Sequence, residues 1–436
     1  MAFAELPDDL VARVLALVAP RDLEAVTVAS KTVSQHVLPR FPLWKALFCF
    51  RWAQLNFSLE DAQRPGEHAA IEIDQRVREL LPSSVTESRM FQLLAHAITP
   101  VPSYADVNAT MRFRRNTWMD HTVVALGSDV LDYRQRDKRR TKVRSLDFAF
   151  VGRYLGGDRS VRANAPFPTT FHVQVLKVRA PNGACSYKVG VTASGYFEIT
   201  ITKREPLQGA YRVAASDMTA IGIGSNSFRL IGKQPGWDED SYGYHGDDGH
   251  YFHRAGHGHE FGPSFDVGDT VGCGVRRSLR EQRSTVFFTN SGDLIPDGDG
   301  GIECENEDWF PVVGLDSANA VHVNYGQEPF RYGAIVDELF DECRGQTSVL
   351  VNQLQWYDIS ESDVESTCDE DEMSEGSSAY REDDDAEEDD DDDAAEVEAE
   401  AFLHRMLFAG DYGEDTEDDE DGSALELEDD GDDEME

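Results

Sequence analysis

Five of the twelve histidines of the chain lie in one short run, Tyr244–Glu260, which reads YHGDDGHYFHRAGHGHE. Histidine and aspartate side chains at such spacing could hold a zinc ion, or could exchange protons as a general acid and base. A zinc site needs three or four ligands that converge at about 2.1 Å and a second layer of hydrogen bonds that orients them. Whether the run is such a site depends on the elements that surround it.

Other catalytic signatures are missing from the sequence. There is no GxSxG, no HExxH, no GxxxxGK[ST], and no GxGxxG at the start of a helical segment. The many Gly-x-Gly pairs are typical of turns. The sequence therefore predicts a protein that is not an enzyme, with no catalytic residues and no cofactor.

Charge is distributed very unevenly along the 436 residues. The segment Asp358–Glu436 holds 39 acidic residues and two arginines, so it supplies −37 of the net charge of −43. Six cysteines without a CxxC pair indicate a reducing compartment, and the start MAFAELPDDL lacks the pattern of a signal peptide. No apolar run approaches the roughly 18 residues that cross a bilayer. We expect a cytoplasmic and/or nuclear protein that does not contact a membrane.

The first 57 residues have helical periodicity. Leu10, Val14 and Leu17 repeat at i, i+4 and i+7, which is one face of an amphipathic helix. Pro20-Arg21-Asp22 begins a second helix, Pro39 and Pro42 end it, and Leu43-Trp44 begins a third. A unit of this size is near the lower limit for a core of its own, so we expect a partner to cover part of its apolar surface.

This segment resembles the F-box over nearly its whole length, through Leu6-Pro7, Val14-Leu15, Pro20–Leu23, Val28–Ser30 and Leu43-Trp44. The resemblance implies that the helices dock onto the Skp-family adaptor of a cullin–RING ubiquitin ligase. The residues that it assigns to adaptor binding are Leu6, Pro7, Leu10, Val14, Leu15, Leu23, Val28, Leu43 and Trp44.

From Trp118 onward, short runs of β-branched and aromatic residues alternate with Gly, Asp and Asn, which is typical of an antiparallel β-sandwich. Several segments resemble the SPRY (B30.2-like) domain of the Ran-binding-protein-M type. The segments that carry this resemblance are Gly195–Ile199, Pro235–Asp238, Ser241–His250, Gly268–Val275, Phe287–Gly292, Trp309–Leu315 and Asn324–Phe330.

The chain departs from that family in three respects. It lacks the LisH and CTLH helices that normally follow, it carries about 25 extra residues at Thr169–Ala193, and the stretch Ile295–Asp308 is expanded. The resemblance also bears on the histidine run, because in the family this run is a strand, a tight turn and a second strand. We therefore expect no metal site there. The family's binding loops imply that the target-binding residues are Arg162, Pro166, Pro168, Trp237, Tyr242, Tyr244, Asp316, Ser317 and Asn319.

Two charged segments leave alternatives open. The basic stretch Arg134–Arg144 is typical of a nuclear-localisation or nucleic-acid-binding patch, but also of a solvated strand and loop. We favour the solvated strand and loop, and therefore expect no nucleic-acid partner. A third possibility is a contact with the acidic tail. The tail cannot bury enough apolar surface to fold, so we expect it to be disordered. Within it, Phe402–Leu407 forms either one face of a short helix that binds a partner or an accidental apolar island.

The sequence thus predicts a multidomain α + β protein. Its expected parts are an N-terminal three-helix F-box (1–57), a helical linker (58–110), an antiparallel SPRY β-sandwich (111–335), a connecting segment (336–357) and a disordered acidic tail (358–436). The expected function is that of the substrate-recognition subunit of a Skp–cullin–F-box type ubiquitin ligase. Its expected partners are the Skp-family adaptor, the cullin scaffold and a protein substrate that the sequence does not identify. The alternative is a non-catalytic nuclear or chromatin-associated adaptor that binds basic proteins through its tail.

Overall fold

The computed structural model describes residues 7–59, 70–81, 83–102, 123–126, 147–150, 154–155, 158–203, 211–212, 218–230, 232–278, 283–296, 301–317, 319–344 and 346. All of them belong to the first of two compact units, Met1–Val364. The basic stretch Arg134–Arg144, Leu6 and the acidic tail lie outside the described residues. Among the helices that are described, none combines the length and the apolar character needed to span a membrane.

Helices form where the N-terminal periodicity predicts them. They are α1 (Asp8–Leu15), α2 (Pro20–Ala29), a π-helical turn (Val33–Val37), α3 (Leu38–Arg40) and α4 (Leu43–Leu55). The expected second helix is interrupted, because Ser30 adopts an extended conformation and ends α2. Pro39 does not end a helix but lies in the first turn of α3, where its missing N–H is tolerated.

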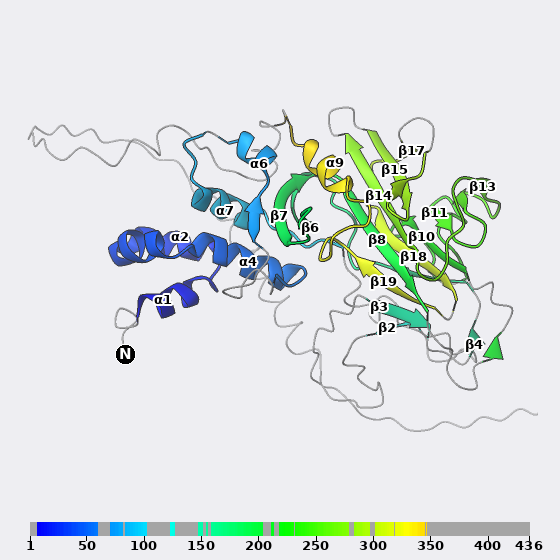
Figure 1. Ribbon diagram of the computed structural model, residues 1–436, viewed down its shortest axis with the longest axis horizontal. Helices are drawn as coiled ribbons and strands as arrows, with labels where there is room; N and C mark the ends of the chain where they lie inside the picture. The colour runs from blue at the N-terminus through cyan, green and yellow to red at the C-terminus, as the bar shows by residue number, and fades with distance from the viewer. Residues whose placement is uncertain are drawn as a thin grey trace, which may run out of the picture. The chain divides into compact units, whose positions relative to one another are not determined.

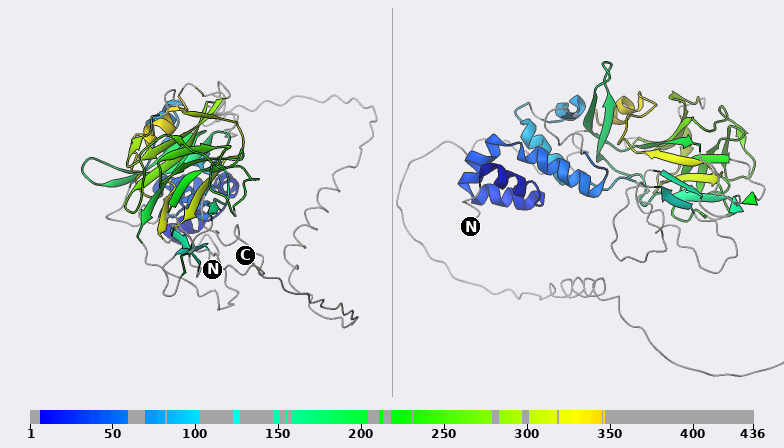
Figure 2. Two further views of the ribbon diagram at one scale, coloured as in Figure 1. Left: turned by 90° about the vertical axis from the view of Figure 1, so that its right-hand side faces the viewer. Right: turned by 60° about the horizontal axis from the view of Figure 1, so that its bottom comes forward.

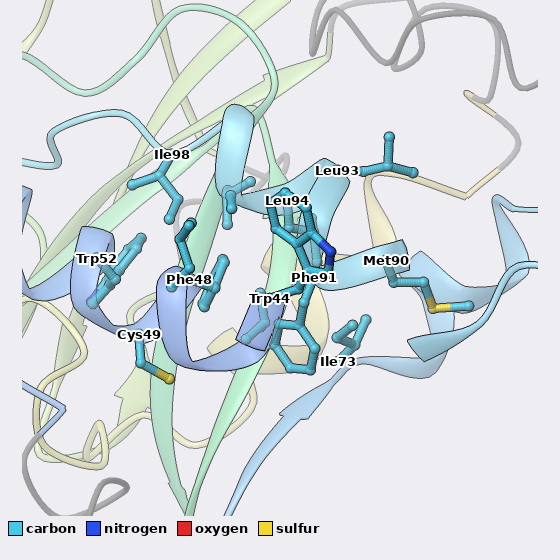
Figure 3. Packing of buried hydrophobic residues seen from close by; sticks show 14 of the residues in the cluster. Trp44, Phe48, Cys49, Trp52, Ile73, Met90, Phe91, Leu93, Leu94 and Ile98 are labelled. Atoms are coloured by element: carbon cyan, nitrogen blue, oxygen red, sulfur yellow. The ribbon is translucent and has the colours of Figure 1, made fainter. Parts of the chain in front are cut away.

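The expected helical linker contains a strand as well as helices: β1 (Ile71–Ile73), α6 (Gln75–Glu79) and α7 (Glu87–His96). Side-chain oxygens cap both helices, since Asp74 accepts from the Arg76 N–H and Thr86 accepts from the Arg89 N–H. Figure 3 shows how α4 and α7 pack, with large apolar side chains from both helices turned toward one another. The rings of Phe48 and Phe91 meet edge to face with centroids 5.5 Å apart.

The extra residues Thr169–Ala193 form a hairpin that does not join either sheet of the sandwich. Its strands, β6 (His172–Arg179) and β7 (Cys185–Thr192), pair antiparallel, and β1 adds to β7 in parallel to complete a three-stranded sheet. Val173, Val175, Val189 and Val191 are buried in the same core as α4 and α7. The hairpin therefore completes the core of the N-terminal helices, while Leu176 of β6 is buried in a second cluster with Tyr196 and Phe287 of the sandwich.

Two antiparallel sheets face each other in the sandwich (Figure 1). The six-stranded sheet has the order β13 (His259–Glu260), β12 (His250–His253), β11 (Ser241–His245), β10 (Met218–Gly224), β18 (Phe310–Asp316), β5 (Arg159–Arg162). The larger sheet has the order β16 (Asp293–Leu294), β15 (Arg283–Asn290), β14 (Thr270–Ser278), β8 (Gly195–Thr202), β19 (Ala320–Asn324), β3 (Asp147–Phe150), β2 (Val123–Leu126), with β17 (Ile302–Cys304) on β15. A short parallel pair, β4 (Tyr154–Leu155) and β9 (Tyr211–Arg212), stands apart.

The histidine run forms β11, a turn, β12 and β13, as the family resemblance implies. Gly249 has φ +72°, a left-handed conformation that glycine adopts without strain, and it permits the reversal. Two of the histidines bond to main-chain carbonyls: His245 Nε2 lies 2.9 Å from the Pro235 oxygen, and His253 Nδ1 lies 2.9 Å from the Ser241 oxygen. Nowhere in the described part of the chain do three or more His, Cys, Asp or Glu side chains gather in a group that could hold a metal ion.

The segment expected to be a connector begins as a helix, α9 (Ile335–Asp341). Figure 2 shows α9 beside the β6–β7 hairpin. A Cβ on Gly190 of β7 would lie 2.2 Å from the Phe340 ring, so only glycine lets the helix approach this closely. The same helix packs against the sandwich through Leu339 and Phe340, which share a core cluster with Tyr196 and Phe287. Helix α9 therefore contacts both the hairpin and the larger sheet.

Candidate functional site

The target-binding residues predicted from the sequence lie around strand β18, but at its two opposite ends. Arg162 pairs with Val312 near the beginning of the strand, whereas Asp316 is its last residue. At about 3.3 Å per residue, a strand of this length separates its ends by roughly 20 Å. The structure therefore does not bring Asp316, Ser317 and Asn319 together with Arg162. We call the end that carries Arg162 and Tyr242 the binding end.

At the binding end, Arg162 is engaged by the chain itself. Its Nη1 donates to the main-chain oxygens of Ser225, at 3.2 Å, and Asn226, and its Cζ lies 4.9 Å from the centroid of the Phe310 ring. Partial burial lowers the pKa of Arg162, but the guanidinium of arginine stays charged in proteins. These contacts hold the loop 225–226 beside β18, and the charged side chain of Arg162 is half-buried there.

Tyr242 lies on β11 at the binding end and is part of the sandwich core. It is 5% exposed, its ring stacks on His253 with centroids 4.0 Å apart, and it meets Trp309 edge to face at 5.2 Å. Burial above all, with smaller contributions from Cys304, Glu305 and Glu307 and an opposing one from Arg254, raises the pKa of Tyr242 to about 12. The hydroxyl of Tyr242 has no hydrogen-bond partner among the described residues and is not one of their buried unpaired polar atoms, so it is open to solvent.

Pro166 and Pro168 are half-buried at the same end. Between them, Phe167 is buried in the sandwich core, and its N–H donates to the Trp309 oxygen at 2.8 Å. This hydrogen bond ties the proline loop to the segment before β18. The structure therefore places Arg162, Tyr242 and the two prolines at the same end of the sheet.

Tyr244 and Trp237 occupy different environments. Tyr244 is 0% exposed and belongs to the sandwich core, where its hydroxyl donates to the Pro263 oxygen and accepts from Asn290. A side chain in that position holds the two sheets together and offers no surface to a target. Trp237 is half-buried, with its ring centroid 6.3 Å from that of His245 and its indole N–H without a partner among the described residues.

The three predicted residues at the far end of β18 are largely inaccessible. Asp316 and Ser317 are 7% and 1% exposed. The Ser317 hydroxyl accepts from the Asn319 N–H at 3.1 Å, so it shapes the local turn. This loop therefore stabilises the link between β18 and β19, and it presents little more than the half-buried Asn319 to a partner.

Sequence reasoning gave no role to the acidic side chains that border Tyr242. Asp240, Glu305, Glu307 and Asp308, which we call the acidic rim, are exposed or half-buried and form no ion pair with any described residue. Partial burial and then the nearby Glu305, Asp240 and Asp308 carboxylates raise the pKa of Glu307. Three of the four come from the expanded stretch Ile295–Asp308. The unusual length of this stretch was the one feature of the sequence that could have drawn attention to these residues.

The predicted adaptor-binding residues divide into two groups. Leu15, Leu23, Leu43 and Trp44 lie in the protein's own core, at 3%, 0%, 1% and 3% exposure, so they cannot serve as surface anchors in this conformation. By contrast Leu10, Val14 and Val28 are 41%, 45% and 89% exposed, and Pro7 is exposed at the start of α1. The periodicity of apolar residues in the sequence does not distinguish the buried group from the exposed group. It shows that a helix has an apolar face, but not whether that face packs against the chain's own core.

The fold and the binding end define a SPRY domain. The SPRY family model matches residues 195–328, and domains of this kind mediate protein interactions. Among similar proteins, the Ran-binding proteins 9/10 homolog of Drosophila melanogaster is 37% identical over 146 residues, which cover 33% of this chain and 13% of that protein. Ran-binding protein 9 of Danio rerio is 32% identical over 173 residues, or 39% of this chain and 25% of that protein.

A plant relative and a solved structure complete the comparison. The Ran-binding protein M homolog of Arabidopsis thaliana is 36% identical over 139 residues, covering 31% of this chain and 26% of that protein. The crystal structure of a human SPRY domain aligns over 42% of this chain and 92% of that one, at 23% identity and a TM-score of 0.28. The chain thus spans about a quarter or less of the length of the relatives named here.

Proposed function

We propose that this chain is the substrate-recognition subunit of a Skp–cullin–F-box type ubiquitin ligase and that its SPRY domain binds the target protein. The N-terminal segment would bind the Skp-family adaptor, and the adaptor would link the chain to the cullin scaffold. The proposal is supported by the F-box resemblance in the sequence and by the presence of a protein-interaction domain on the same chain.

The observation that carries the proposal is an apolar surface on the N-terminal helices. Leu10 and Val14 on α1 and Leu17 in the turn that follows are 41%, 45% and 57% exposed, and Val28 at the end of α2 is 89% exposed. Helices normally bury such a stripe, and contiguous exposed apolar side chains mark protein-interaction sites. Leu10, Val14 and Leu17, which follow one face at i, i+4 and i+7 and which we call the α1 surface, lie within the segment that resembles the F-box, as does the separate exposed Val28.

In this function the chain itself performs no chemistry. It would hold a target close to a ubiquitin-carrying enzyme, and the gain in rate would come from effective concentration and orientation. Such a role requires no catalytic residue and no cofactor. It is compatible with a location in the cytoplasm, the nucleus or both.

The proposal is tested by affinity purification of the full chain from cells. Wild type is expected to recover Skp-family adaptor and cullin, and Leu10→Asp with Val14→Asp is expected to lose both, because carboxylates on the α1 surface would have to be desolvated. The matched control is Val267→Asp with Leu294→Asp, which alters two side chains exposed to a similar degree, 40% and 39%, on the sandwich. The proposal would be contradicted if the control variant failed to recover adaptor and cullin, or if the Leu10→Asp, Val14→Asp variant still recovered them.

A second candidate rests on the −37 charge of the segment Asp358–Glu436. A tract of this kind can bind basic proteins electrostatically, so the chain would act as a non-catalytic nuclear or chromatin-associated adaptor. The same purification separates the two functions. Recovery of histones or other basic proteins without adaptor and cullin favours the second.

A further inference from the structure

Glu342, which directly follows α9, binds the corner at which the inserted hairpin meets the sandwich. We call Thr192, Ala193 and Ser194 the hairpin corner, because they lead from the end of β7 into β8. Glu342 Oε2 accepts from the Thr192 hydroxyl at 2.9 Å and from the Ala193 N–H at 3.2 Å. Its Oε1 accepts from the Ser194 hydroxyl, which accepts in turn from the Arg277 N–H of β14 at 2.8 Å. One carboxyl group therefore joins the end of α9 to the hairpin and, through Ser194, to the larger sheet.

The carboxyl group of Glu342 is largely removed from water and has no bonded cation. Thr192 and Ser194, which donate to it, are 0% and 1% exposed, and it forms no ion pair with any described residue. Arg277 acts on it through space, but the guanidinium of Arg277 donates to the loop before β18. A carboxylate in such surroundings costs more than the neutral acid. Burial therefore outweighs the bonds from its donors and raises the pKa of Glu342 to about 7.

Other titratable groups lie around the hairpin corner. Burial lowers the pKa of His172 on β6 to about 4 and raises the pKa of Cys343, next to Glu342, to about 11. The guanidinium of Arg277 stays charged, and Asp341 of α9 is ion-paired with an arginine of α6 at 2.5 Å. Of these groups, Glu342 is the one whose pKa burial places near neutral pH.

Helix α9 bridges the N-terminal helices and the sandwich. On one side, Asp337 is ion-paired with Arg76 of α6 at 2.7 Å. On the other side, Glu338 is ion-paired with Arg276 of β14 at 2.8 Å. Exposed ion pairs contribute little to stability, and the side chain of Asp337 is 69% exposed. Detachment of α9 would break both pairs and with them a link between the N-terminal helices and the sandwich.

We propose that α9 is a proton-regulated clasp. Neutral Glu342 holds the helix closed on the hairpin corner, and ionisation of Glu342 increases the fraction of molecules in which α9 is detached. Apolar packing keeps the closed form dominant, since Leu339 and Phe340 are 3% and 0% exposed. In the detached form Glu342 reaches water, where its charged form is favoured. The closed form therefore binds the proton more tightly, and the stability that this gives it is lost as pH rises from about 4.5 to about 7.

The test measures hydrogen exchange of the purified full chain at pH 5.5 and pH 7.5. Each rate is divided by that of an unprotected amide at the same pH, which gives the fraction of molecules open at that amide. We expect the open fraction of α9 to be about tenfold or more higher at pH 7.5. The amides of β10 and β18 should stay more protected than those of α9 at both pH values, because α9 opens without unfolding of the sandwich.

Three variants separate Glu342 from the rest of the helix. Glu342→Gln, whose side chain does not ionise, is expected to keep the open fraction low at both pH values. Glu342→Ala lacks the acceptor and is expected to raise the open fraction at both. Asp337→Asn removes a carboxylate from the same helix and, as the matched control, should keep the wild-type dependence on pH.

A second measurement, at pH 7.5 alone, follows Cys343, which is 0% exposed and next to Glu342. N-ethylmaleimide should label this thiol about tenfold or more slowly in Glu342→Gln than in wild type. The proposal would be overturned by equal open fractions of α9 at the two pH values, by a pH dependence that persists in Glu342→Gln, by equal labelling of Cys343, or by equal protection of α9 and the sandwich strands. Neither adaptor nor target enters these measurements, so their outcome is independent of the proposed function.

Discussion

Ile71 on β1 and Tyr187 on β7 are direct partners in a parallel strand pair. In the sequence, β1 lies before the strands of the sandwich, and β7 belongs to the hairpin inserted among them. Lys45 on α4 donates from Nζ to the Ile71 oxygen at 2.8 Å, so β1 is held by a helix on one side and by the inserted hairpin on the other. Arg76, next to β1, also bonds Asp337 at 2.7 Å and Asp341 at 2.5 Å, both on α9. The hairpin and α9 therefore bind the N-terminal helices to the SPRY region.

If the hairpin completes the N-terminal core, disrupting it should destabilise helices distant in sequence. Val189→Asp places a carboxylate at a position that is 0% exposed, where desolvation costs several kcal/mol. We expect the amides of α4 and α7 to exchange hydrogen for deuterium faster in this variant. Ala184→Asp, in the exposed turn of the same hairpin, is the control. Unchanged exchange in α4 and α7 would mean that the hairpin does not support the helices.

Glu342 should make stability depend on pH. Burial raises the pKa of Glu342 to about 7, although it accepts from the Thr192 hydroxyl at 2.9 Å and the Ala193 N–H at 3.2 Å. The native state therefore holds a proton that the unfolded chain releases near 4.5, so the free energy of unfolding falls as pH rises from about 4.5 to 7, by about 3 kcal/mol in all.

In Glu342→Gln, the free energy of unfolding should fall much less between pH 5 and pH 8 than it does in wild type. Chemical denaturation at the two pH values measures this difference. Burial lowers the pKa of His172 to about 4 and produces the opposite trend below pH 6.5, but this effect is common to wild type and variant and cancels in their difference. Glu72→Gln, which neutralises an exposed carboxylate, is the control. Identical pH dependence in wild type and Glu342→Gln would rule out Glu342 as the source.

Arg277 should determine the order of the acidic rim. Its guanidinium donates to Asn306 Oδ1 and to the Glu307 main-chain oxygen, so Arg277→Met removes both bonds and leaves Asn306 Oδ1 with only the Ser284 hydroxyl as a donor among the described residues. We expect faster hydrogen exchange in residues 305–308 of this variant. The neighbouring Arg276 bonds Glu338 at 2.8 Å and lies over the Phe287 ring, so Arg276→Met is a control that should leave the rim unaffected. Equal effects of the two variants would contradict this role.

Removal of divalent metal should leave the melting temperature unchanged, because His245 and His253 are already bonded to main-chain carbonyls. A structural zinc ion would contribute a large part of the folding free energy. Thermal unfolding with and without a chelator checks this. A large fall that added zinc reverses would restore the metal interpretation of the histidine run.

The sequence predicted the sandwich strands well, since runs such as Val271–Val275 and Thr285–Thr289 lie inside β14 and β15. It did not predict the partner of the inserted hairpin, because the valines of β6 and β7 can pack on any apolar face and β1 is only three residues long. The binding end was partly predictable. Arg162 and Tyr242 lie at that end of the sheet, whereas the hydroxyl of Tyr244 bonds the Pro263 oxygen and Asn290, although both tyrosines belong to the same core cluster. Periodicity alone predicts that both side chains point inward, but not which partners their hydroxyls have.

The central claim is tested most directly by isothermal titration calorimetry of the purified full chain with a purified Skp-family adaptor. The account predicts a one-to-one complex, together with a loss of binding of at least about fivefold in Leu10→Asp, since an anchor of this kind contributes about 1–3 kcal/mol. The melting temperature of that variant should stay close to the wild-type value, because Leu10 is 41% exposed. No detectable heat from the folded wild-type chain, or undiminished binding by the variant, would contradict the account.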